Sequence, residues 1–121
     1  MKRQFNKQWI DENKRAILAE FDDFNLDNPC VNWRRLNRCQ AWHTGDALIS
    51  YRTLVAIRKW CQFEDGTARN VVFAKDTFSP TTVKHIYTFA REVEAKYIVF
   101  LNSSKGPYAV RLKRMVGEYY V

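Results

Sequence analysis

The fold is decided by the stretch Leu48-Ile49-Ser50-Tyr51-Arg52-Thr53-Leu54-Val55-Ala56-Ile57. Its β-branched and aromatic residues are typical of a strand on a half-buried surface. Asp65-Gly66 follows at the position of a hairpin turn, because glycine accepts the positive φ that such turns need. Val71-Val72-Phe73-Ala74 then predicts the partner strand. We expect one strand over 47–57, and its core face comprises Ile49, Tyr51, Thr53, Val55 and Ile57.

A helix is predicted directly after this hairpin. Ser79 is a good N-cap, and Pro80 occupies the first helical position, where its missing N–H costs nothing. An apolar stripe at helical spacing indicates the buried side: Val83, Ile86, Tyr87, Ala90 and Val93. The polar side holds Lys84, His85, Thr88, Arg91 and Glu92, and Phe89 lies off the stripe.

The flanking segments complete an α+β pattern. An amphipathic helix is predicted over Phe5–Phe24 and a short strand over Cys39–His43, whereas Cys30–Arg38 fits either a helical turn or the lead into a strand. Tyr97–Leu101 predicts a central strand covered on both faces, and 108–112 a strand with one basic face. The order is α-β-β-β-α-β-β, which favours a mainly antiparallel sheet of about five strands in one domain spanning 1–121.

Composition limits the class of protein. The chain has 121 residues, of which 46% are hydrophobic, so we expect a globular domain. No segment is long and apolar enough to predict a membrane span, and the basic N-terminus lacks the apolar core of a signal peptide. Three cysteines at irregular spacing indicate reduced thiols rather than a disulfide framework. We therefore expect a cytoplasmic protein.

Charge is unevenly distributed. The net charge is +7; residues 1–30 carry five Lys/Arg against six Asp/Glu, and residues 31–121 carry fifteen against seven. A cationic body suits an acidic partner, either nucleic acid or an acidic protein surface. The alternative is a solvated basic surface that aids solubility.

Basic residues beside aromatic ones give the main binding hypothesis. Such pairs suit neutralisation of a nucleic-acid backbone together with base stacking. Most aromatic residues of a small domain are core residues, however, and no RNP motif, helix-turn-helix or zinc finger is visible. The predicted binding residues are Arg34, Arg35, Arg38, Arg58, Lys59, Arg111, Lys113 and Arg114.

Catalytic and metal sites have weaker support. Hydroxyls at a helix N-terminus can bind an anion, so Ser79, Thr81, Thr82 and His85 are a possible anion site. The alternative is a serine cap followed by a surface histidine. Only Cys39 and His43 approach the spacing of zinc ligands, and no second pair exists. No Gly-rich phosphate loop, HExxH or GxSxG motif is present, so we predict neither an enzyme, a cofactor nor a metal.

Two motifs resemble a family of small bacteriophage and mobile-element proteins of unknown function. The family pattern is Ser-Tyr-x-Thr-x-Val-Ala, a turn, a strand, then Ser-x-Thr-Thr-x-x-His. This chain has Ser50-Tyr51-Arg52-Thr53-Leu54-Val55-Ala56 and Ser79-Pro80-Thr81-Thr82-Val83-Lys84-His85. The resemblance covers about a third of the chain. It implies a phage-type accessory protein acting in the host cell, and it transfers no catalytic role.

Three functional hypotheses follow. The first is a non-enzymatic protein whose basic face binds nucleic acid or a host nucleoprotein. The second is an inhibitor of a host defence protein that acts through the acidic first helix or exposed aromatics. The third is a small hydrolase that uses His85. Both a monomer and a dimer are compatible with the sequence, because exposed edge strands can pair between subunits.

Overall fold

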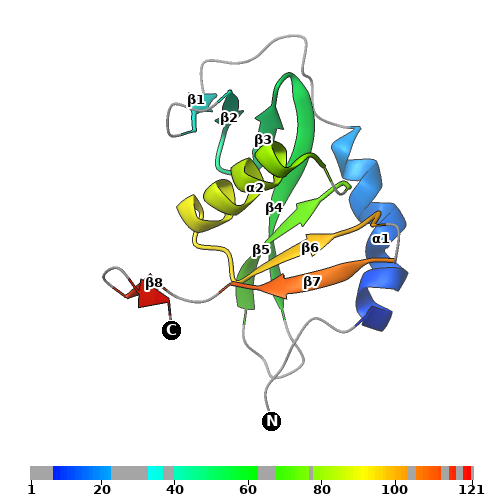
Figure 1. Cartoon of the computed structure of the whole chain (residues 1–121). Helices are drawn as coiled ribbons and strands as arrows, with labels where there is room; N and C mark the ends of the chain where they lie inside the picture. Colours follow the sequence, from blue (N-terminus) through cyan, green and yellow to red (C-terminus); the bar gives the residue numbers. More distant parts are fainter. Residues whose placement is uncertain are drawn as a thin grey trace.

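A computed structural model describes residues 7–22, 33–36, 40–62, 68–76, 78–103, 106–112, 115–116 and 119–120. Two helices and nine strands follow one another along these segments (Figure 1). In chain order they are α1 (Lys7–Phe21), β1 (Arg34–Arg35), β2 (Ala41–His43), β3 (Ala47–Ser50), β4 (Thr53–Gln62), β5 (Ala68–Ala74), α2 (Pro80–Glu92), β6 (Tyr97–Phe100), β7 (Tyr108–Arg111), β8 (Met115–Val116) and β9 (Tyr119–Tyr120).

The strands form one large mixed sheet and one small ribbon. The sheet has the order β1-β2-β3-β4-β5-β6-β7, and β8 pairs only with β9. Every neighbouring pair in the sheet is antiparallel except β5 and β6, which are parallel because α2 carries the chain back between them. The α+β class is confirmed. The expected number of strands is wrong, since seven strands form the main sheet.

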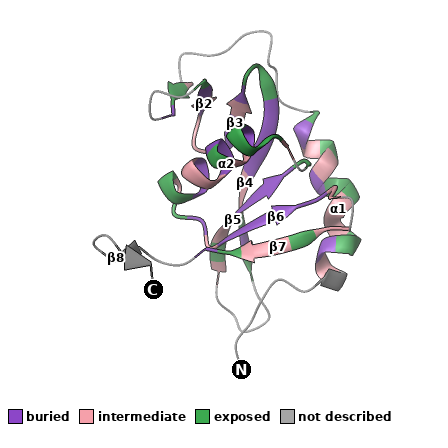
Figure 2. Cartoon of the chain, in the orientation of Figure 1, coloured by how far each residue is buried: buried purple, intermediate pink, exposed green. Residues whose placement is uncertain are grey.

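Helices cover both faces of the sheet, so there are two cores. On one face, Ile10, Ile17 and Phe21 of α1 pack in a cluster with alternate residues of β5 and β6. On the other face, Ile86 and Phe89 of α2 pack with the intervening residues of the same two strands, whose side chains point to this side of the sheet. All four residues of β6 are consequently buried, as the sequence predicts for a doubly covered strand (Figure 2).

The expected single strand over 47–57 is wrong. It is divided by a two-residue turn, in which Ser50 pairs with Thr53 and Tyr51 and Arg52 form the loop. Both loop residues have positive φ, +50° and +78°, as both central residues of a type I′ hairpin turn require. The predicted core face is also wrong, because Tyr51 and Thr53 are exposed.

Helix α2 begins where the sequence predicts. The Ser79 hydroxyl accepts a hydrogen bond from the Thr82 N–H, and Pro80 is the first helical residue. The helix ends in a Schellman motif, in which Ala95 N–H bonds Ala90 O at 2.8 Å while Glu94 has a φ of +56°.

The buried side of α2 differs from the expected stripe. It comprises Thr82, His85, Ile86, Phe89 and Ala90. The expectation that Phe89 lies off the buried stripe and His85 on the polar side is wrong, because they are 0% and 5% exposed. Phe89 packs in the core cluster between α2 and the sheet, and His85 contacts the Ser50 hydroxyl at the end of β3.

The first helix is described over Lys7–Phe21, within the predicted Phe5–Phe24. The segment Cys30–Arg38 contains the short strand β1, which resolves the open alternative in favour of a strand at Arg34–Arg35. The predicted turn at Asp65-Gly66 lies outside the described residues. Neither described helix is long and apolar enough to cross a membrane.

Candidate functional site

Ser50, Thr82 and His85 form a buried polar cluster between the β3–β4 hairpin and the first turns of α2. The Ser50 Oγ lies 2.9 Å from His85 Nδ1 and 3.2 Å from Thr82 Oγ1. The three residues are 2%, 7% and 5% exposed. Ser50 ends β3, and α2 presents Thr82 and His85 on its sheet-facing side, so the cluster joins residues more than thirty positions apart.

The hydroxyls of this cluster form a chain that ends at the imidazole. The Ser79 Oγ–H donates to Thr82 Oγ1 at 3.4 Å. In one consistent arrangement of the remaining protons, the Thr82 hydroxyl donates to Ser50 and the Ser50 hydroxyl donates to His85 Nδ1. Burial lowers the pKa of His85, which favours the neutral ring that can accept at Nδ1.

The cluster supports an exposed aromatic residue. The Tyr51 ring lies against the His85 ring, with their centroids 5.7 Å apart, and Tyr51 is 54% exposed. Non-glycine residues at positive φ cost about 1–3 kcal/mol each in special contexts, and surrounding structure must hold them in place. Two such residues are adjacent here, and the bonds of Ser50 to α2 hold the turn that contains them.

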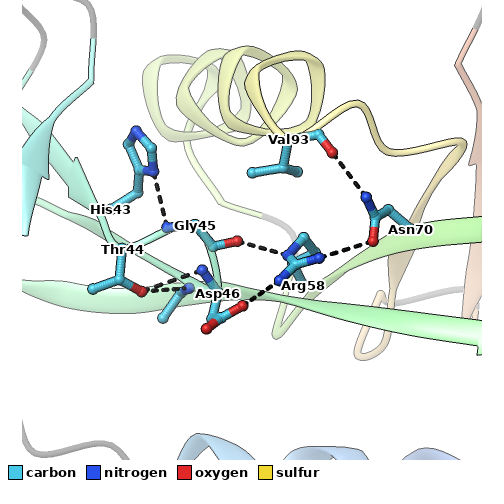
Figure 3. A network of polar contacts seen from close by, with 8 residues as sticks. His43, Thr44, Gly45, Asp46, Arg58, Asn70 and Val93 are labelled. Atoms are coloured by element: carbon cyan, nitrogen blue, oxygen red, sulfur yellow. Dashed lines mark hydrogen bonds and ion pairs between the residues drawn. The ribbon is translucent and has the colours of Figure 1, made fainter. Parts of the chain in front are cut away.

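A second polar network surrounds Arg58 on β4 (Figure 3). Its Nε donates to Gly45 O at 2.8 Å and its Nη1 to Asn70 Oδ1 at 2.9 Å, while Nη2 contacts the Asp46 carboxylate. The Asn70 Nδ2 in turn donates to Val93 O, 3.1 Å away at the end of α2. The network therefore ties the β2–β3 turn, β4, β5 and α2 together.

His43 ends β2, directly before the same turn. Its Nδ1 accepts a bond from the Gly45 N–H at 3.1 Å, and its ring packs edge-on against Phe89. Burial, assisted by the Arg34 charge and opposed by Glu92, lowers the pKa of His43. The imidazole is consequently held in its neutral form.

The predicted basic residues do not come together. Arg58 and the adjacent Lys59 point to opposite faces of β4, and Lys59 forms a bond with each carboxylate oxygen of Glu20 on α1, at 2.8 and 2.7 Å. Arg34 and Arg35 lie exposed on the edge strand β1.

Arg111 lies on β7, at the opposite edge of the seven-stranded sheet from β1. Arg38, Lys113 and Arg114 lie outside the residues that the structure describes. A single patch built from the five described residues is not formed.

The predicted anion-site residues have divided roles. Ser79, Thr82 and His85 belong to the hydroxyl chain, and Thr81 is exposed beside them on the helix. Sequence reasoning missed Ser50 and Tyr51 as partners of His85. The signal that could have found them is that Ser-Tyr and Thr-x-x-His occur in the two motifs quoted above.

The Ser50–His85 pair has the separation of a nucleophile and its base, but both side chains are almost fully covered. No group of three possible metal ligands from His, Cys, Asp or Glu occurs among the described residues. Cys39, considered above with His43 for zinc, lies outside them. The accessible chemistry at the site is therefore that of Tyr51 and Arg52.

Searches against protein-family models, curated proteins and solved structures found no match to the chain.

Stability is expected to fall with acidity below about pH 6.5. The pKa values of His43 and His85 in the folded protein lie below the ordinary 6.5. As the pH falls from 6.5 to those lowered values, the unfolded chain therefore binds more protons than the folded protein does, and the free energy of unfolding decreases. Above this pH window, the two neutral histidines make their full contribution to the free energy of unfolding. Urea unfolding at pH 7.5, 6.5 and 5.5 measures the effect, and a His43→Gln/His85→Gln variant should have a flatter profile. An unchanged slope in that variant would contradict the assignment.

Proposed function

We propose that the protein binds nucleic acid without catalysis, and that its contact point is the exposed Tyr51–Arg52 turn. The observation that carries the proposal is the pair of successive non-glycine residues at positive φ, held by a buried hydrogen-bonded cluster. Strain of this kind collects at ligand-binding positions, where an exact side-chain placement has been kept at a cost in stability. Asn-Gly would form the same turn without this cost.

The chemistry of the turn fits a nucleic acid. Tyr51 offers an exposed ring on which a base can stack, and Arg52 offers a guanidinium group for phosphate. The contact of the Tyr51 ring with His85, which Ser50 holds in place, reduces the conformational entropy that Tyr51 would lose on binding. The net charge of +7 favours association with a polyanion.

The other hypotheses have less support. A hydrolase would need substrate access to Ser50 and His85, which are 2% and 5% exposed. For an inhibitor that uses the acidic helix, Glu20 is already bound to Lys59. The biological setting that we propose follows the resemblance: an accessory protein of a phage or mobile element that acts in the host cytoplasm. There its partner is nucleic acid, either free or as part of a host nucleoprotein.

Arg52→Gly separates binding from stability. Glycine removes the strain of a φ of +78°, so the free energy of unfolding should rise by about 1 kcal/mol. Loss of the guanidinium should weaken binding of a labelled 12-nucleotide strand about tenfold and make its salt dependence shallower. Urea unfolding and fluorescence anisotropy at two salt concentrations measure both effects.

Arg69→Ala is the matched control for charge. Arg69 is exposed near the start of β5 and bonds only locally, to Ala68 O, among the contacts described. The Arg69→Ala variant should bind the 12-nucleotide strand with an affinity within twofold of the wild type. Equal affinities for Arg52→Gly and the wild type would show that the turn is not the contact point, and absence of wild-type binding at low salt would refute the proposed function.

A further inference from the structure

The outer side of α2 continues the contact surface beyond the turn. Lys84, Tyr87 and Arg91 occupy positions i, i+3 and i+7, which form one row on a helix. Lys84 and Arg91 are exposed on the side of α2 opposite His85 and Phe89, whereas Tyr87 between them is half-buried and packs against the edge of the core. Lys84 directly precedes His85, against whose ring Tyr51 packs, so the row begins at the same level of α2 as the contact with the turn.

The row carries one aromatic ring and lies close to a second. The Arg91 guanidinium carbon lies 5.7 Å from the centroid of the Tyr87 ring. Burial raises the pKa of Tyr87, as does the neighbouring Tyr108, while Arg91 lowers it. Tyr87 packs against the core cluster that contains Phe100, and Tyr108 of β7 stacks on Phe100, so both tyrosine rings border the same part of the core.

Tyr108 presents a supported ring to solvent. It stacks on the buried Phe100 with centroids 5.1 Å apart, and it is 41% exposed. A ring fixed from below by another ring offers its outer face without losing rotational freedom on binding. The strip formed by Lys84, Tyr87, Arg91 and Tyr108 thus combines two positive charges and two aromatic rings, and it contains no carboxylate.

We infer that this strip makes the protein selective for single-stranded nucleic acid. The inference rests on the proposed function and names the substrate class for the same surface. Bases in a duplex stack on each other and leave only their edges accessible, whereas unpaired bases can stack on Tyr108 and Tyr51. Lys84 and Arg91 complement the phosphates between them. The surface extends along helix α2, which is about 20 Å long for its 13 residues. It is therefore an elongated strip rather than a single contact point.

The test uses labelled single strands of 6, 12 and 18 nucleotides and an 18-base-pair duplex, with the intact protein at one fixed salt concentration. We expect the 12-nucleotide strand to bind at least fivefold more tightly than the 6-nucleotide strand and at least tenfold more tightly than the duplex. Tyr108→Leu retains apolar cover over Phe100 but removes the aromatic face, so it should lose at least fivefold in affinity for the single strand and less than twofold for the duplex.

Arg91→Gln should weaken single-strand binding and reduce the salt slope by about one. Arg69→Gln removes the same charge elsewhere and should not change the preference. Wild-type binding that is equal for strand and duplex, or Tyr108→Leu and Arg91→Gln variants that bind like Arg69→Gln, would overturn the inference while leaving the turn as a binding site. Absence of all binding by the wild type would overturn both proposals. Thermal melting confirms that each variant is folded.

Discussion

Arg58→Ala is expected to lower the free energy of unfolding by about 2–3 kcal/mol. The guanidinium crosses from β4 to the β2–β3 turn and to β5, and alanine leaves Gly45 O and the Asn70 amide without it. Hydrogen bonds to charged groups contribute about 1.5–3 kcal/mol each. The Arg58 side chain is 30% exposed, so water replaces part of this, and the contact to the 63%-exposed Asp46 adds little. Urea unfolding at pH 7.5 measures the loss.

Lys59→Ala is the matched control, because it removes a neighbouring charge with a simpler role. Its pair with Glu20 has side-chain exposures of 33% and 41%, and such pairs contribute at most about 1 kcal/mol. The two variants have the same net charge, so a general electrostatic effect would be equal in both. If Arg58→Ala cost no more than Lys59→Ala, the network would not have the structural role assigned to it.

Ser50→Ala should cost about 1–3 kcal/mol and also weaken nucleic-acid binding. The change removes the hydroxyl between Thr82 and His85 and leaves the buried Nδ1 without its partner. The Tyr51–Arg52 turn then loses its hydrogen bonds to α2 and keeps only the ring contact with His85, so its strained conformation is less well held. Urea unfolding and anisotropy with the 12-nucleotide strand measure the two losses together.

Thr53→Ala is the matched control for Ser50→Ala, because it removes an exposed hydroxyl from the residue that pairs with Ser50. It should change the free energy of unfolding by less than about 0.5 kcal/mol.

In a double-mutant cycle, Ser50→Ala and His85→Ala together should lower the free energy of unfolding by less than the sum of the two single changes. Strict additivity would mean that the two side chains do not interact energetically.

Much of the fold follows from local signals in the sequence. The Ser79-Pro80 start of α2 and the doubly covered strand β6 are both confirmed. They could be predicted because a helix cap and an apolar run are each visible within a few neighbouring residues. The division of 47–57 could not be predicted, since Tyr51 and Arg52 are not residues that favour a type I′ turn. Tertiary contacts impose this turn, and they are not visible in a window of ten residues.

The candidate site was found only in part. The sequence predicts a possible role for His85, but the polar contact that accompanies its burial is made by Ser50, which lies 35 residues earlier in the chain. Arg58 and Lys59 were selected for charge, and the structure instead engages them in internal contacts on opposite faces of β4. A basic residue beside an aromatic one has the same appearance in sequence whether it binds a ligand or a neighbouring strand.

The strand order of the sheet has a kinetic consequence. Each strand from β1 to β7 pairs with the strand that precedes it in the chain, so no pairing has to wait for a distant segment. Pairing between consecutive strands keeps the strand-to-strand contacts close in sequence, which is associated with rapid folding. The parallel pair is the exception, because β6 joins β5 only after α2 has formed its crossover. During synthesis, the sheet can therefore grow strand by strand up to β5, and we expect docking of β6 to limit the folding rate.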